Sequence, residues 1–190
     1  MDVIHFDRIF ELVSSERFLK NLSSGGEMPF YISAYDVAKE NFLLENIELL
    51  QKRLKNKSIQ PLLIDLYDVA LDCLMEEDDL EDYFELETSI SKKEFIQTLG
   101  HALDTKEILI PHIHHLIKEA EPDVVMMVGV GKVFPFIRSH SIVNYLENII
   151  KDIPLVLFYP GEYKAMKLSL FSRIKTENHY RAFSVEDIQF

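Results

Sequence analysis

The chain has 190 residues, 47% hydrophobic and 27% charged, which is the composition of one well-packed globular domain. Its formal net charge of −12 disfavours general binding to nucleic acid or anionic membranes, because such binding needs clustered lysine and arginine. No apolar run reaches the about 18 residues that a membrane-spanning helix requires. The single cysteine, Cys73, cannot form an internal disulfide and fits a reducing cytoplasm.

The first part of the chain predicts a helix, a strand and a second helix. Apolar residues recur at a period near 3.6 over Ile4–Leu22, and the glycines of the SSGG sequence at 23–26 would end that helix. The β-branched and aromatic run Phe30–Tyr35 predicts the first strand. Asp36 is then placed to cap a helix over Val37–Lys55.

A second strand is predicted over Leu62–Tyr67, with Asp65 inside it, and a helix follows over Val69–Met75. Next comes a strongly acidic stretch, Met75–Glu87, in which aromatic residues interrupt the carboxylates. We interpret this stretch either as a solvated loop with its aromatic side chains tucked against the fold, or as a docking segment for a basic partner surface. The residues expected to dock are Glu76, Glu77, Asp78, Asp79, Tyr83 and Phe84.

Helical patterns follow the acidic stretch. A serine three residues before a glutamate forms a capping-box sequence, which predicts a helix over Lys92–Ile108. Pro111 would bend or restart this helix, which continues to about Ala120. Because residues 75–120 lengthen one crossover well beyond its minimum, we predict a helical, acidic insertion in a single domain spanning residues 1–190.

Two very apolar runs, Val124–Val130 and Leu155–Tyr159, predict buried strands, with a helix within Pro135–Ile150 between them. Tyr180–Val185 predicts a short final strand. Strands that alternate with helices of about ten or more residues indicate an α/β fold. We predict a single three-layer domain with a mostly parallel sheet of about five strands and helices on both faces, like a P-loop protein without its P-loop.

Polar residues follow both of these apolar runs, at the carboxyl edge where open α/β sheets place their binding sites. If the Gly129–Arg138 loop turns its cations to one edge, it would bind an anion such as a phosphate group or a partner's carboxylate. The alternative is that Lys132 points to solvent and that Arg138 pairs with Glu162 or Asp65. The residues of this predicted anion or partner loop are Gly129, Gly131, Lys132, Arg138, His140, Gly161, Glu162 and Tyr163.

The GVGK sequence at 129–132 does not match a nucleotide-binding motif. A P-loop needs a glycine five residues before the glycine of its Gly-Lys pair, where Met126 stands, and a hydroxyl residue after the lysine, where Val133 stands. A dinucleotide fingerprint would need a glycine at Phe134. We therefore predict no cofactor and no nucleotide hydrolysis.

The histidines do not form a metal-binding pattern. Only His112 and His115, three residues apart, would share a helix face, and the chain has no pair of cysteines to complete a zinc site. The chain also lacks a GxSxG sequence. We predict no metal site and no catalytic residues.

Five segments give the chain a resemblance to a known family. They are PFYISAYD at 29–36, PLLIDLYD at 61–68, GVGKVFPFIRSH at 129–140, PLVLFYPGEY at 154–163 and HYRAFSV at 179–185. On these segments the chain resembles the BrxB family of BREX phage-defence systems over nearly its full length. The acidic, histidine-containing stretch matches least well.

The resemblance implies a cytoplasmic bacterial accessory protein, encoded beside a DNA methyltransferase, a large ATPase and a phosphatase-like protein of the PglZ type. It also implies physical association with PglZ, and it supplies no catalytic residues. We therefore expect a non-enzymatic adaptor that binds a BREX protein, with PglZ the first candidate. The alternative is a ligand-binding or degenerate nucleotide-binding protein that uses the Gly129–Arg138 loop. Direct binding to nucleic acid or membrane is not expected.

Overall fold

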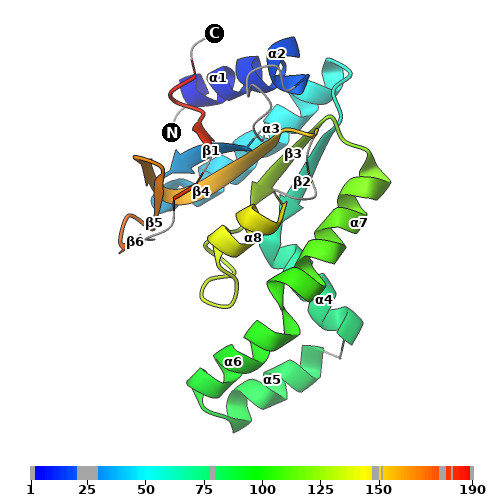
Figure 1. Ribbon diagram of the computed structural model, residues 1–190, viewed down its shortest axis with the longest axis vertical. Coiled ribbons are helices and arrows are strands. Elements are labelled where there is room, and N and C mark those ends of the chain that lie inside the picture. Colours follow the sequence, from blue (N-terminus) through cyan, green and yellow to red (C-terminus); the bar gives the residue numbers. More distant parts are fainter. Residues whose placement is uncertain are drawn as a thin grey trace.

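The computed structural model describes residues 3–20, 30–77, 80–146, 150, 152–175, 179–180 and 182–188 (Figure 1). The helices are α1 (Val3–Val13), α2 (Glu16–Leu19), α3 (Glu40–Asn56), α4 (Leu66–Glu77), α5 (Leu80–Ser89), α6 (Lys92–Ala102), α7 (Ile110–Ala120) and α8 (Ser139–Leu146), with short helical turns η1 (Val37–Lys39) and η2 (Thr105–Leu109). The strands are β1 (Phe30–Tyr35), β2 (Pro61–Asp65), β3 (Val124–Val128), β4 (Leu155–Lys164), β5 (Lys167–Leu170), β6 (Ile174–Lys175) and β7 (Phe183–Ser184).

Five strands form a parallel sheet in the order β2-β3-β4-β1-β7, and β5 and β6 extend β4 as an antiparallel hairpin. The predicted α/β architecture with a mostly parallel sheet is confirmed. Each of the four apolar runs predicted as strands forms one, and β1 has the predicted bounds. The order places β1 beside β4, with Tyr35 opposite Pro160.

The sheet separates two apolar cores. In β3, Val124, Met126 and Val128 pack against the layer of α1, α2 and α3, whereas Val125 and Met127 face the layer of α4, α6, α7 and α8. Every residue of β3 is buried. Helices on both faces leave no solvent-facing side, which is why the central strands have uninterrupted apolar sequences instead of alternating ones.

Two predicted strand ends at the carboxyl edge are wrong. β2 ends at Asp65, because the Asp65 side chain accepts a hydrogen bond from the backbone N–H of Tyr67 at 2.9 Å and so starts α4 at once. β3 ends at Val128, since Gly129 has a left-handed φ of 84°. Consecutive turns follow Gly129, and α8 begins at Ser139, within the predicted range Pro135–Ile150.

The predicted N-terminal helix is two helices in the described part. α1 ends at Val13, and Ser15 then caps α2 by accepting a hydrogen bond from the backbone N–H of Phe18 at 3.3 Å. A serine that bonds the backbone of the next turn begins a helix more readily than it continues one. The SSGG sequence at 23–26 lies outside the described residues.

The predicted capping box of Ser91 and Glu94 is present at the start of α6. This helix ends at Ala102, however, and not at Ile108 as predicted. The reason is a second N-cap. The Asp104 side chain accepts hydrogen bonds from the backbone N–H groups of Lys106 and Glu107, both at 2.9 Å, and η2 begins there. α7 then carries Pro111 in its first turn, so the predicted restart is correct.

The acidic stretch is helical wherever it is described, so its interpretation as a loop is wrong. α4 continues to Glu77, and residues 80–89 form α5. α5 contacts α6, and the pair lies at the end of the molecule furthest from α1 (Figure 1). We call α5 and α6 the helical arm.

β4, β5 and β6 form successive antiparallel pairs where the sequence predicted a loop after Tyr159. β4 continues through Gly161–Tyr163 to Lys164, and β5 returns beside it. The final strand β7 pairs with β1 in parallel and is shorter than the predicted Tyr180–Val185. The segment after β7 lies against α1, because Arg8 donates hydrogen bonds to the carbonyls of Glu186 and Ile188 at 2.7 and 2.8 Å.

Candidate functional site

The carboxyl edge of the sheet carries an ion pair between the ends of two neighbouring strands. The Nζ of Lys132, after β3, donates a hydrogen bond to Oδ2 of Asp65, at the end of β2, over 2.6 Å. The Asp65 side chain is only 14% exposed. Lys132 therefore does not simply point to solvent, and Asp65 pairs with Lys132 rather than with Arg138, contrary to the predicted alternative.

The charge of Lys132 is balanced from within the fold. Burial opposes the charged ammonium, but the hydrogen bond and charge of Asp65, with the further charges of Glu40 and Asp68, outweigh burial and raise the lysine pKa. Lys132 is thus protonated and surrounded by more carboxylates than cations. An incoming anion would have to displace Asp65.

A second buried polar pair lies at the end of β1. The hydroxyl of Tyr35, a residue that is 3% exposed, donates to Oε2 of Glu40 at 2.5 Å. Burial first, then the hydrogen bond and charge of Glu40 and the more distant charge of Asp65, raise the pKa of the Tyr35 phenol. Tyr35 is therefore held as a neutral donor and is unsuited to act as a base at neutral pH.

The backbone of residues 129–133 forms hydrogen bonds within the loop. The N–H groups of Lys132 and Val133 both donate to the carbonyl of Gly129, at 3.0 and 3.3 Å. A phosphate-binding loop points such N–H groups at its ligand instead. Val130 and Val133 are buried in the core, so the loop also serves to pack the end of β3.

The other residues of the predicted anion or partner loop do not converge. Arg138 is exposed, and Glu162 pairs with Lys164 at 3.0 Å, so the predicted pairing of Arg138 with Glu162 is not seen. Gly131 packs against the ring of Phe171, 2.9 Å from where a Cβ would stand. The side chain of His140 lies outside the described residues.

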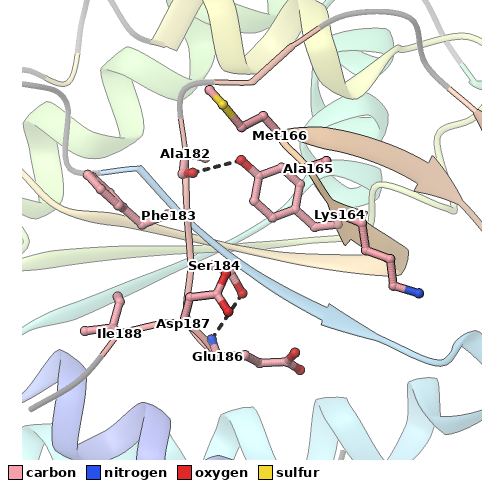
Figure 2. A pocket seen from close by; sticks show the side chains of 10 residues that line it. Lys164, Ala165, Met166, Ala182, Phe183, Ser184, Glu186, Asp187 and Ile188 are labelled. Carbon is pink, nitrogen blue, oxygen red and sulfur yellow. Dashed lines mark hydrogen bonds between the residues drawn. The ribbon is translucent and has the colours of Figure 1, made fainter.

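Tyr163 has a structural partner. Its hydroxyl donates to the carbonyls of Tyr180 and Ala182 at 3.1 and 2.8 Å, which holds the C-terminal segment against β4. Figure 2 shows the groove beside this contact, between the turn at Lys164–Met166 and the segment Ala182–Ile188. Its volume is about 550 Å³, and its rim mixes one lysine with two carboxylates.

A larger cleft of about 890 Å³ lies where β1 and β4 end, at the carboxyl edge. Its lining includes Asp36, Glu162 and Arg173, together with apolar Val37 and Phe171. Like the groove in Figure 2, it presents charges of both signs. Neither therefore has the field of one sign that would select an anion.

The acidic segment divides into buried and exposed parts. Tyr83 is 8% exposed and belongs to the core, whereas Phe84 is 61% exposed. The Glu76 carboxylate lies 3.7 Å from Nδ1 of His112. Of the other predicted docking residues, Asp78 and Asp79, and the side chain of Glu77, lie outside the described residues.

Within the described ranges, no three His, Cys, Asp or Glu side chains come together as a metal site. No helix in that part of the chain is both long and apolar enough to span a bilayer. The polar pairs at the carboxyl edge that sequence reasoning missed are Lys132–Asp65 and Tyr35–Glu40. Asp65 ends β2 and Lys132 follows β3, but the sequence does not show that these two strands are neighbours, so it gives no signal for the first pair.

Together these features define a class: an α/β protein with a parallel sheet, internal polar pairs and a cleft at its carboxyl edge, and a projecting acidic helical arm. Residues 62–185 match the family described as "BREX protein BrxB", and the chain belongs to this family.

Two relatives carry the same description. One, from Bacillus cereus (strain H3081.97), is 36% identical over 183 residues, which cover 95% of both chains. Another, from Escherichia coli O9:H4 (strain HS), is 29% identical over 171 residues, 90% of this chain and 84% of the relative. No solved structure matches the chain.

Proposed function

We propose that this chain is a non-enzymatic adaptor of a BREX anti-phage defence system, and that it acts by binding another BREX protein, PglZ. Membership of the BrxB family supports the BREX assignment. The observation that carries the adaptor role is the exposure of large apolar side chains in the acidic segment: Met75 is 54% and Phe84 61% exposed. Exposed aromatic groups of this kind are typical anchors of protein interfaces.

The carboxyl edge supports a role without catalysis. Two side-chain hydrogen bonds lie there, from Lys132 to Asp65 and from Tyr35 to Glu40. The backbone N–H groups of Lys132 and Val133 both donate to the carbonyl of Gly129. A catalytic site needs polar groups that are free to meet a substrate. The same contacts disfavour the alternative, a degenerate nucleotide-binding loop at Gly129–Arg138.

We expect the purified protein not to hydrolyse ATP or GTP, and magnesium with either nucleotide not to raise its melting temperature. The physical reason is that a bound nucleotide would have to break the Lys132–Asp65 pair, and no hydroxyl residue follows Lys132 to hold magnesium. Phosphate release and thermal melting measure these two outcomes. Hydrolysis that copurifies with the protein and disappears in a Lys132→Ala variant would contradict the proposal.

The adaptor role is tested by binding kinetics with PglZ from the same BREX system. We expect a stable complex, from which Phe84→Ala dissociates about tenfold faster, because a buried interface aromatic contributes about 1.4 kcal/mol or more. The matched control is Leu49→Ala, which truncates an equally exposed side chain (55%) on α3, across the sheet. Tyr83 is unsuitable for this test, since its truncation would remove a core side chain.

Absence of binding between the wild-type chain and PglZ would remove the proposed partner. Equal dissociation rates for Phe84→Ala, Leu49→Ala and wild type would instead leave PglZ as the partner and exclude Phe84 from the interface. Thermal melting of each variant checks that a change in rate does not come from unfolding.

A further inference from the structure

The negative charge of the chain is concentrated in one segment. Residues 58–91 contain eleven acidic residues and no lysine or arginine. The rest of the chain carries 21 acidic and 20 basic residues, so its net charge is only −1. The net charge of −12 therefore belongs almost entirely to β2, α4 and the first helix of the arm.

On α4 these charges line one face. Asp68, Asp72 and Glu76 are spaced four residues apart and all three are exposed. We call them the acidic stripe. The same helix exposes two large apolar side chains, Tyr67 at 44% and Met75 at 54%. An exposed apolar pair beside a stripe of charge is typical of a docking surface with a complementary partner.

The acidic stripe lowers the stability of α4 when no partner is bound. Like charges four residues apart on a helix repel each other. Glu76 also lies in the last turn of α4, which contains no basic residue, so its carboxylate faces the negative end of the helix dipole. The one basic group near it comes from α7, where Nδ1 of His112 lies 3.7 Å away. A basic partner would relieve both effects. The arrangement lowers the stability of the free chain and is expected to raise its affinity for such a partner.

We propose that the acidic stripe, together with Tyr67 and Met75, docks a lysine- and arginine-rich surface of a protein partner. This inference rests on the proposed adaptor function and names α4 as part of its interface. Carboxylates four residues apart are separated by about 6 Å along the helix axis. That spacing suits successive basic side chains on one partner surface.

The test compares two variants that lose the same charge. Asp72→Asn with Glu76→Gln neutralises the stripe, whereas the control, Glu45→Gln with Glu48→Gln, changes exposed positions on α3 across the sheet. We expect the stripe variant to melt about 1–3 °C higher than wild type, and to associate with PglZ at least about threefold more slowly at low salt. Its association rate should also depend less on salt. The control should change neither quantity.

A second probe keeps the test decisive if PglZ is not the partner. It is a short synthetic peptide of alternating arginine and leucine, whose binding is measured by fluorescence anisotropy at two salt concentrations. Failure of wild type to bind PglZ would refute the proposed function alone. Lower melting of the stripe variant, or binding of partner or peptide to stripe and control variants with equal rates and affinities, would refute the docking surface.

Discussion

Replacement of Val125 by aspartate is expected to unfold the protein. Val125 is fully buried in β3, between Leu62 of β2 and Leu155 of β4, and its side chain packs against the α4–α8 layer. A carboxylate placed there has no partner, and such burial costs several kcal/mol against a total stability of about 5–15 kcal/mol. Soluble expression and circular-dichroism melting measure the effect.

The control for this prediction is Val37→Asp. Val37 is 44% exposed, so the new carboxylate would be in contact with water and not with the core. We expect this variant to keep the melting temperature of wild type within a few degrees. A Val125→Asp variant that melts like the control would show that β3 is not the buried centre of the sheet.

Replacement of Gly161 by alanine is expected to lower the melting temperature by about 5 °C or more. Gly161 has a φ of 144°, and an added Cβ would lie 2.1 Å from the carbonyl oxygen of Ser169. The backbone conformation alone costs a residue with a Cβ about 1–3 kcal/mol, and each kcal/mol shifts the melting temperature by about 2–4 °C in a chain of this size. The strand pairing of Gly161 with Leu170 prevents the two backbones from moving apart.

The control for Gly161→Ala is Gly100→Ala. Gly100 lies in α6, and an added Cβ would have no atom within 4 Å. Alanine favours a helix interior over glycine by about 0.8–1.0 kcal/mol, so this variant should melt slightly higher than wild type. Equal melting of the two alanine variants would contradict the backbone conformation described for Gly161.

The sheet could be predicted because its central strands β1, β3 and β4 are buried on both sides, with the edge strand β2 half-buried. The apolar runs that became β1, β2, β3 and β4 lie between sequences with helical periodicity, and burial on both faces requires such runs. Their ends could not be predicted in the same way. The end of β2, for example, depends on one hydrogen bond from the Tyr67 N–H to the Asp65 side chain.

The β4–β5 hairpin could not be predicted because its turn lacks the usual sequence. Two-residue hairpin turns require positive φ and are usually marked by Asn-Gly or Asp-Gly. Here Ala165 and Met166, the two residues of the β4–β5 turn, adopt φ values of 50° and 61°. With no such marker, Pro160 and Gly161 gave the stronger signal and indicated the end of a strand.

Some residues of the candidate site were predicted from the sequence, but the contacts between them were not. Lys132 was predicted at the carboxyl edge and Asp65 inside the second strand, yet their contact depends on β2 and β3 being neighbours, which is a property of the sheet order. The acidic segment was recognised as a docking candidate, but the burial of Tyr83 and the exposure of Phe84 depend on how the arm packs. Local sequence does not contain either fact.

The order of strands also determines how long β1 is without its neighbours during translation. β1 is synthesised early, but its neighbours β4 and β7 come from the last part of the chain. About 120 residues separate β1 from β4, which at about 5–20 residues per second corresponds to roughly 6–24 s of translation. During that interval the strand FYISAY has neither of its native neighbours, so the nascent chain carries an unpaired apolar strand until β4 has been synthesised.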